Sequence, residues 1–330
     1  MDTVKSFSKD IVLLDDVAKV TATIAQKIQE DIFHVLKRRG GVIGISGGID
    51  SSVCLALTCK ALGNEKVTGI IMPEQDSSSD SEKLALELAE KFKIKTITEN
   101  ITGALKGFKC YERRDEAVKN VFPEYDPAQH KMKIGVKDSG LYSNLPPLFS
   151  VTIIDKQGNE KENRLPVKEY LQIVAASNFK QRSRMSMLYY HAERLHCAVV
   201  GTPNKHEKEQ GFFVKYGDGG ADIMPISNLY KTQVYQLAKY FEIPRSIIDR
   251  VPTTDTYTAE QTQEEFFYQM PFHLMDIYWY GYENNYSPEE VGKVMGIEKE
   301  KVEALFLNFY RKQKTNEYLR MAPIGEYYPL

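Results

Sequence analysis

Residues 46–52 read Ser-Gly-Gly-Ile-Asp-Ser-Ser, a run whose composition suits the binding of phosphate. An apolar segment precedes it, and a helical pattern begins at Ser51. Two glycines at a turn from strand to helix let the backbone approach a ligand closely, and the unpaired N–H groups at the helix start point toward it. The serine hydroxyls add donors, whereas the Asp50 carboxylate makes sense beside phosphate only with a cation, for which magnesium is the candidate. The predicted phosphate site consists of Ser46, Gly47, Gly48, Asp50, Ser51 and Ser52.

This run differs from the two better-known phosphate-binding loops. It lacks the Gly-Lys-Ser/Thr ending of the Walker loop and the third glycine of the dinucleotide-binding fingerprint. It resembles the Ser-Gly-Gly-x-Asp-Ser loop of the N-type ATP pyrophosphatases. That resemblance implies cleavage of ATP between its α- and β-phosphates, with the adenylate activating a second substrate. A plain polar turn is the alternative, but the strand before the loop and the helix after it favour phosphate binding.

A second polar segment, residues 201–207, follows another apolar strand pattern. Its Glu207 can approach the same cation as Asp50, and two carboxylates with phosphate oxygens suit a hard ion such as Mg²⁺. We interpret His206 as a surface or loop-packing residue and not as a metal ligand. Residues 212–222 add glycines, two aspartates and a lysine, a density of polar groups that is hard to explain by packing.

Strand and helix patterns alternate around these polar segments. Strand patterns cover residues 42–46, 66–72, 95–98 and 197–200, and helical patterns cover residues 15–38, 51–62 and 81–92. This alternation predicts a doubly wound α/β fold, with a mostly parallel sheet and helices on both faces. Ligands bind at the carboxyl ends of the strands in such folds, where both polar segments lie.

We expect a single domain over residues 1–330 with two additions. Residues 112–169 are interpreted as an insert with a β-hairpin, because residues 149–154 and 162–165 flank the turn sequence Lys-Gln-Gly-Asn. Residues 285–330 are interpreted as a helical C-terminal extension that opens with a Ser-Pro-Glu-Glu capping box.

The composition limits the class of protein. The chain has 330 residues, 42% of them hydrophobic, and a net charge of −2, so it can bury a large core and has no overall charge that attracts nucleic acid. The four cysteines lack the paired spacing of a zinc or iron–sulfur site, and we expect reduced thiols. The N-terminal sequence carries aspartates among short apolar pairs, so it is unlike a secretion signal or a membrane span. We therefore expect a soluble cytoplasmic protein that binds neither membranes nor nucleic acid.

Further motifs resemble those of the NAD synthetase family and recur in the same order. The match covers residues 20–110 and 175–325. Its motifs lie at residues 178–185, 201–207, 215–222, 225, 229–233, 252–253 and 261–265. The resemblance implies that ammonia amidates nicotinic acid adenine dinucleotide through an acyl-adenylate, giving NAD, AMP and pyrophosphate. It also implies Mg²⁺, ATP as co-substrate and a homodimer.

The resemblance assigns roles position by position. Asp50 and Glu207 would hold Mg²⁺. Besides the phosphate loop, the residues near ATP would be Arg182, Thr202, Lys231 and Thr253. The residues that cradle the dinucleotide would be Asn178, Lys215, Asp218 and Asp222.

Charge decides the expected mechanism. Lys215, Lys231 and magnesium would offset the charge that develops on the phosphates, so no covalent protein intermediate is needed. Asp218 is the candidate for orienting ammonia or accepting its surplus proton, although capping a turn or binding substrate explains this residue equally well.

Three features depart from the family pattern, and all concern the substrate side. They are the length of the region 131–169, Gln263 where an aspartate is common, and Leu319 in a run that is more basic in the family. A related ligase that amidates a different carboxylate is therefore the first alternative. A nucleotide-binding protein without turnover is the second.

The nitrogen source should be free ammonia or a separate donor protein. A glutaminase module adds a whole domain with a nucleophilic cysteine, for which this chain has no room. The tRNA-modifying relatives that share the ATP loop rely on a basic surface or on paired cysteines, and this chain has neither.

Overall fold

A four-stranded parallel sheet forms the centre of the molecule. The computed structural model describes residues 6–137, 148–253, 256–259 and 261–325. In this part of the chain the strand order is β3-β2-β1-β7, and every neighbouring pair is parallel. The strands are β1 (Gly41–Gly44), β2 (Val67–Ile71), β3 (Lys95–Thr98) and β7 (Ala198–Val200). The predicted strands are all present, and the predicted fold class is confirmed.

The chain winds over both faces of this sheet in turn. From β1 it passes through α2 (Ile49–Leu62) to β2 and through α3 (Ser79–Phe92) to β3, with both helices on one face. It returns over the other face through α4 (Thr102–Gly107), α5 (Cys110–Val121) and α6 (Val167–Leu195) to β7. Since the direction of winding reverses between β1 and β7, the carboxyl ends of these two strands flank the point where such sheets bind ligands.

Alternate strand residues face two separate cores, as the period of a β-strand requires. Ile43, Val67 and Ile71 belong to the cluster formed with α2 and α3. Val42 and Ile70 belong to the cluster formed with α5 and α6. The runs without polar alternation in β1 and β2 therefore reflect burial of both faces of the sheet.

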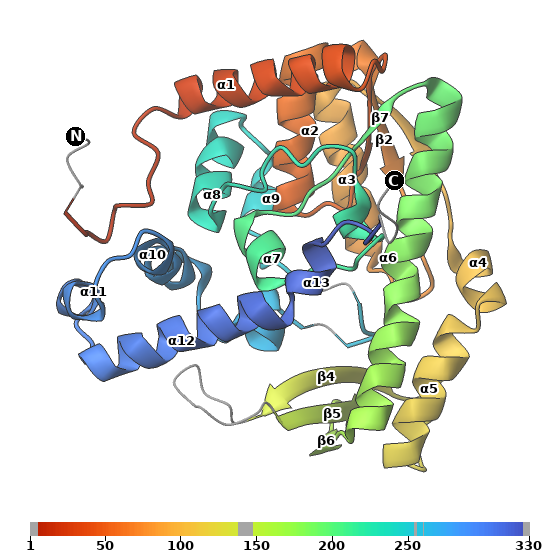
Figure 1. Ribbon diagram of the computed structural model, residues 1–330. Helices are drawn as coiled ribbons and strands as arrows, with labels where there is room; N and C mark the ends of the chain where they lie inside the picture. The colour runs from red at the N-terminus through yellow and green to blue at the C-terminus, as the bar shows by residue number, and fades with distance from the viewer. Residues whose placement is uncertain (1–5, 138–147, 254–255, 260, 326–330) are drawn as a thin grey trace.

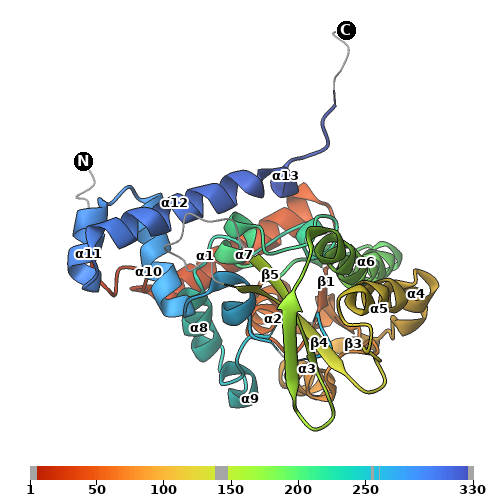
Figure 2. The same cartoon turned by 90° about the horizontal axis from the view of Figure 1, so that it is seen from below.

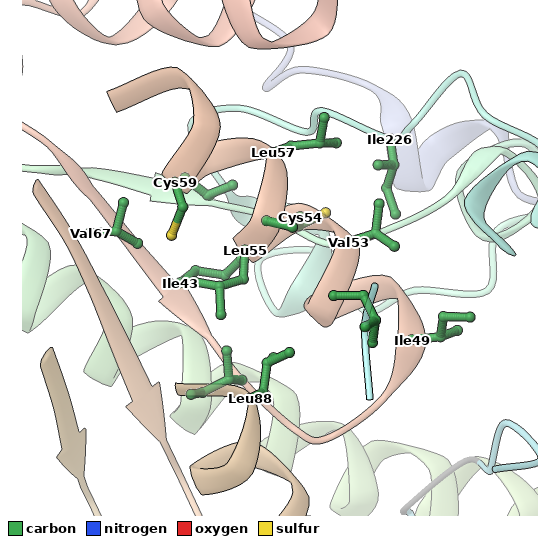
Figure 3. Packing of buried hydrophobic residues seen from close by; sticks show 14 of the residues in the cluster. Ile43, Ile49, Val53, Cys54, Leu55, Leu57, Cys59, Val67, Leu88 and Ile226 are labelled. Atoms are coloured by element: carbon green, nitrogen blue, oxygen red, sulfur yellow. The ribbon is translucent and has the colours of Figure 1, made fainter. Parts of the chain in front are cut away.

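Helix α2, whose first turn contains the last residues of the phosphate loop, is buried on nearly all sides. It packs between the sheet, α1 (Val17–Glu30) and α8 (Lys231–Tyr240). Figure 3 shows its side chains Val53, Leu55 and Leu57 among those of the neighbouring elements. A helix that is apolar on all sides is held rigidly by its neighbours, so the loop at its N-terminus has a fixed position.

The region between β3 and β7 contains more regular structure than the sequence predicts. Its hairpin is confirmed as β5 (Leu148–Ile154) and β6 (Glu160–Arg164), but β4 (Lys131–Lys137) adds a third antiparallel strand. Helix α5 runs through the predicted start of the insert at residue 112, and α6 begins at Val167, just before the insert's predicted end at residue 169. Helix α6 extends from this small sheet to the parallel sheet, as Figure 1 shows. Whether residues 112–169 are an insert remains a prediction.

The last part of the chain is helical, as predicted, but its helices begin at Phe272. They gather on one side of the molecule, away from α4 and α5, in Figures 1 and 2. Ser287 accepts a hydrogen bond from Glu290 N and confirms the predicted capping box. None of the described helices is long and apolar enough to cross a membrane. After β7 the helices are α7 (Lys205–Gln210), α8, α9 (Arg245–Ile248), α10 (Phe272–Glu283), α11 (Pro288–Met295), α12 (Lys299–Thr315) and α13 (Glu317–Arg320).

Candidate active site

A cavity of about 620 Å³ lies at the carboxyl ends of β1, β2 and β7. One face of α6 lines it from Tyr170 through Asn178 to Leu188, a distance of about 27 Å at 1.5 Å per residue. The cavity is therefore elongated and runs from the parallel sheet toward the three-stranded sheet. The predicted site residues that line it are Ser46, Gly48, Asp50, Ser51, Asn178, Thr202, Glu207, Asp218 and Thr253.

The two glycines of the phosphate loop do different work. Gly47 has φ +74°, and a Cβ built on it would lie 2.8 Å from Leu84 Cβ and from Ser81 O, so a larger residue does not fit. Gly48 is extended and caps α2, leaving the first N–H groups of the helix directed at the cavity. Gly47 therefore allows the tight turn, and Gly48 forms the N-cap that leaves the helix N–H groups free toward the cavity.

The serines of the loop also divide into two groups. Ser52 is fully buried and donates its hydroxyl to Gly48 O at 2.8 Å, so it stabilises the turn. Ser46 and Ser51 line the cavity, where their hydroxyl oxygens lie 3.3 Å apart. The hydroxyls available to a phosphate are therefore those of Ser46 and Ser51.

Asp50 is the centre of a polar group built from three parts of the chain. Its carboxylate forms an ion pair with the buried ammonium group of Lys231 at the start of α8. It also accepts a hydrogen bond of 3.2 Å from Asn204 Nδ2, and Asn204 caps α7. Asn204 in turn forms a capping box with Glu207, whose Oε2 accepts from Asn204 N at 2.9 Å. Asn204 therefore joins the two predicted metal-binding carboxylates.

The two carboxylates fit a magnesium ion that shares its coordination with a phosphate. Burial, followed by the negative charge of Asp50, raises the pKa of Glu207 to about 8. A divalent cation between the two groups would remove that repulsion and favour the ionised form of Glu207. No cluster of three or more His, Cys, Asp or Glu residues that could hold a metal occurs in the described part of the chain. Mg²⁺ is commonly held by one or two carboxylates plus phosphates and water, so a pair is sufficient.

Asp218 is a further acidic residue that lines the cavity. Its Oδ1 accepts a hydrogen bond of 2.9 Å from Val214 N, which closes the turn that precedes it. Burial raises the pKa of Asp218 to about 6, while the hydrogen bond from Val214 and the charge of Arg184 oppose that rise. Asp218 therefore caps this turn and also lines the cavity.

The cavity and its residues agree with what the chain resembles. The sequence matches the NAD synthase family over residues 17–145 and 149–323. The NH3-dependent NAD⁺ synthetase of Rhizobium rhizogenes is 42% identical over 319 residues, which cover 97% of this chain and 95% of that protein. The NH3-dependent NAD⁺ synthetase of Mesorhizobium japonicum is 44% identical over 301 residues, covering 91% and 94%. This chain belongs to the NAD synthase family.

A solved structure of an NAD synthetase has a similar fold. An NH3-dependent NAD synthetase from Campylobacter jejuni, solved in complex with nitrate, superposes with a TM-score of 0.60 at 23% identity, covering 94% of this chain and 100% of that one. This likeness agrees with the predicted fold, while the family model and the curated relatives confirm the predicted family. The two curated relatives are covered almost completely by this chain, so the long region between β3 and β7 is not peculiar to it.

Besides Gly47, Ser52 and Lys231, three of the predicted site residues lie outside the cavity lining. Lys215 Nζ donates to the carbonyl oxygens of Tyr318 and Met321, at 2.8 and 2.9 Å. Asp222 is exposed and accepts hydrogen bonds from Tyr189 OH at 3.0 Å and from Val199 N at 2.8 Å. Arg182 is exposed on α6 and bonds to Lys215 O at 3.3 Å. Their roles toward substrate remain predictions.

Three cationic residues of the cavity wall, Lys180, Arg184 and Arg250, were not predicted from the sequence. Lys180 and Arg184 flank Arg182 in the 178–185 motif, and both line the cavity. Helical spacing could have found Arg184, because residues 177, 181, 184 and 188 fall on one face of α6. Lys180 is almost fully buried by ion pairs with Glu74 and Asp76, which periodicity does not reveal.

Proposed function

We propose that this protein makes NAD by joining ammonia to nicotinic acid adenine dinucleotide, with ATP converted to AMP and pyrophosphate. The observation that carries the proposal is the phosphate loop at the switch point of the sheet, with Asp50, Lys231 and Glu207 beside it. Membership of the NAD synthase family supports the same reaction.

In this proposal the phosphates of ATP bind at the start of α2. The N–H groups beyond Gly48 and the hydroxyls of Ser46 and Ser51 would donate to phosphate oxygens. Lys231 would offset the charge that develops on the departing pyrophosphate, while Thr202 and Thr253 line the same cavity and would hold the nucleotide. These are positioning and electrostatic roles, so no covalent bond to the protein is required.

We assign the metal site to Asp50 and Glu207. A bound Mg²⁺ would supply charge neutralisation for the phosphates of ATP. The fit rests on the oxygen donors of the two carboxylates and on the raised pKa of Glu207, which is due first to burial and then to the negative charge of Asp50. Lys231 holds the Asp50 carboxylate in place, because its ammonium group is buried against that carboxylate.

The second half of the reaction needs a group that places ammonia beside the activated carboxyl carbon. We assign this role to Asp218, which lines the cavity and has a pKa near 6, so it is ionised at neutral pH. An ionised carboxylate can accept a hydrogen bond from ammonia and take its surplus proton after attack. Free ammonia, or ammonia delivered by a separate protein, would serve as the nitrogen source.

The dinucleotide would lie along α6, beside Asn178. Lys215 and Asp222 would reach it only after the C-terminal segment moves or when a second subunit completes the pocket. We propose a cytoplasmic homodimer. Val167 and Leu171, one helical turn apart at the start of α6, are exposed at 66% and 58% and support a subunit interface there.

The test is a single reaction mixture containing the purified protein, ATP, Mg²⁺, ammonium and nicotinic acid adenine dinucleotide. NAD, AMP and pyrophosphate should appear in equal amounts, and omission of ammonium should abolish NAD. Pyrophosphate release without NAD would instead indicate that a different carboxylate is the substrate. Absence of both products would leave a nucleotide-binding protein without turnover. Light scattering of the same preparation would give its subunit number.

A further inference from the structure

A buried pair, His206 and Asp276, is adjacent to the proposed metal and phosphate residues: His206 precedes Glu207, and Asp276 contacts the backbone of Lys231. Both side chains are fully buried, and His206 Nε2 lies 2.5 Å from Asp276 Oδ1. His206 precedes Glu207 on α7, whereas Asp276 belongs to α10 in the C-terminal helices. Burying a carboxylate is costly unless it is well bonded, so the pair needs an explanation beyond packing.

Asp276 holds the start of the helix that carries Lys231. Its Oδ2 accepts from Thr232 N at 2.7 Å, and its Oδ1 accepts from Lys231 N at 3.3 Å. These N–H groups have no partner within their own helix, and a negative charge at a helix N-terminus is favourable. Burial alone would raise the pKa of Asp276, but the hydrogen bonds from His206 and Thr232 lower it, so the group is ionised. The backbone of Lys231 is thus fixed at Asp276 while its ammonium group reaches Asp50.

His206 holds the helix that carries Glu207. Its ring lies between Asp276 on one side and Gln210, whose Nε2 is 3.3 Å from His206 Nδ1, on the other. The rings of Tyr268 and Trp279 pack around it, with centroids 6.1 and 5.7 Å away. The orientation of α7, and with it that of Glu207, is therefore set by contacts with the C-terminal helices.

A second carboxylate on α10 repeats this arrangement at the edge of the cluster. Glu283 lies two turns after Asp276 and hence on the same face of the helix. It accepts a hydrogen bond from Tyr230 OH and pairs with Lys205 at 2.9 Å. Tyr230 caps α8 and Lys205 begins α7. Helix α10 therefore contacts the N-terminal ends of both helices twice, once through Asp276 and once through Glu283.

We infer that His206 and Asp276 are a positioning pair that fixes Glu207 and Lys231 relative to Asp50, and thereby sets the affinity for ATP with its magnesium. This inference rests on the proposed function of the same site. It makes α10 part of the framework of the active site, although none of its described residues lines the cavity. It also gives His206 a role that the sequence did not suggest.

Binding of ATP tests the inference without relying on turnover. Calorimetry would compare the parent with Asp276→Asn, His206→Leu and His206→Gln, using ATP with Mg²⁺ and ATP with EDTA. Residues that support metal ligands typically change metal affinity by about 10- to 100-fold. We expect Asp276→Asn and His206→Leu to weaken the binding of ATP with Mg²⁺ at least about tenfold, and the binding of ATP in EDTA by less than about twofold. His206→Gln retains a donor toward Asp276 and should lose less.

Tyr268→Phe is the matched control. Its hydroxyl, in the part of the chain that the structure describes, has no hydrogen-bond partner, and the ring that packs on His206 is kept. This variant should bind ATP with Mg²⁺ like the parent. Trp279 is the single tryptophan of the chain and touches the same cluster, so its emission maximum reports whether each variant keeps the cluster packed.

Two results would separate this inference from the proposed function. If the His206→Leu and Asp276→Asn proteins fold, keep the Trp279 emission and bind ATP with Mg²⁺ as tightly as the parent, the pair is only structural and the inference is wrong. If Asp276→Asn does not fold, the comparison of His206→Leu with His206→Gln decides the matter. A parent that binds ATP with Mg²⁺ but makes no NAD would overturn the proposed substrate alone. A parent that does not bind it would overturn the proposed function at its first step.

Discussion

Asp50 is the residue on which the proposed chemistry depends most. Its carboxylate pairs with Lys231 and accepts a hydrogen bond from Asn204, so in the proposed mechanism it would contribute to both phosphate and metal binding. We expect Asp50→Asn to slow pyrophosphate release by at least about 100-fold, which corresponds to about 2.7 kcal/mol of transition-state stabilisation. Asp10→Asn, on the exposed N-terminal segment, is the control and should retain parent activity. Normal turnover of the Asp50→Asn protein would remove this residue from the site.

Asp218 makes a prediction about pH. Burial raises the pKa of Asp218 to about 6, so the folded protein holds this proton to a higher pH than the unfolded chain, where the pKa is about 3.8. The stability that the group contributes is therefore complete below pH 3.8 and is lost as the pH rises through 6. We expect Asp218→Asn to gain about 1 kcal/mol in free energy of unfolding, relative to the parent, between pH 5 and pH 7.5, and to lose NAD formation. Urea unfolding at both values checks this, and a pH-independent difference between the two proteins would contradict it.

At the scale of elements, a buried ionic network ties the segment between β2 and α3 to α5 and α6. Lys180 Nζ lies 2.9 Å from Glu74 Oε1 and 2.8 Å from Asp76 Oδ2, and Arg114 lies 2.5 Å from the same Asp76 oxygen. We expect Lys180→Met to lower the free energy of unfolding by about 3–5 kcal/mol, because it leaves two buried carboxylates short of a cation. Lys168→Met, at an exposed position of the same helix, should change it by less than about 0.5 kcal/mol. Equal unfolding midpoints in urea for the two variants would show that the network contributes nothing.

The same network explains which elements could be predicted from the sequence. The strands and helices around the phosphate loop were predictable because both faces of β1 and β2 are buried, which produces uninterrupted apolar runs. Helix α5 was missed because its sequence is rich in charge, and one of those charges, Arg114, is buried where it pairs with its neighbour Asp115 and with Asp76 from another segment. Periodicity treats such a residue as exposed. Only the tertiary structure supplies its partners.

For the site, the sequence predicted the segments that line the cavity, but it did not predict the direction in which each side chain points. Asp50 and Glu207 were predictable because each follows a strand at the same edge of the sheet. Lys215 carries an equally characteristic motif, yet its ammonium group is bonded to backbone carbonyls near the end of the chain. That contact joins residues 103 and 106 positions apart, and no local pattern encodes it.

At the scale of the whole molecule, the segment after α12 closes one side of the cavity. Tyr318 and Leu319 line it, and Arg320 fastens the segment by donating from Nη1 to the carbonyl oxygens of Lys208 and Glu209, at 3.1 and 2.9 Å. These two carbonyls lie near the C-terminal end of α7, whose first turn carries Glu207, so one end of that helix bears the proposed metal ligand and the other end holds the cavity wall. The folding of distant parts of the chain against one another therefore creates the substrate side of the site.

Loosening this segment should affect the dinucleotide and not ATP. We expect Arg320→Met to raise the KM for nicotinic acid adenine dinucleotide about fivefold, equivalent to about 1 kcal/mol, because the wall formed by Leu319 and the carbonyls that hold Lys215 lose their fixed position. The affinity for ATP should change by less than about twofold, since Arg320 bonds to no residue of the phosphate loop or of α8. Arg113→Met, on the exposed side of α5, is the matched control. A KM that rises equally for ATP and for the dinucleotide would mean that the variant disturbs the whole cavity, and an unchanged KM for both would show that this segment plays no part in holding the substrate.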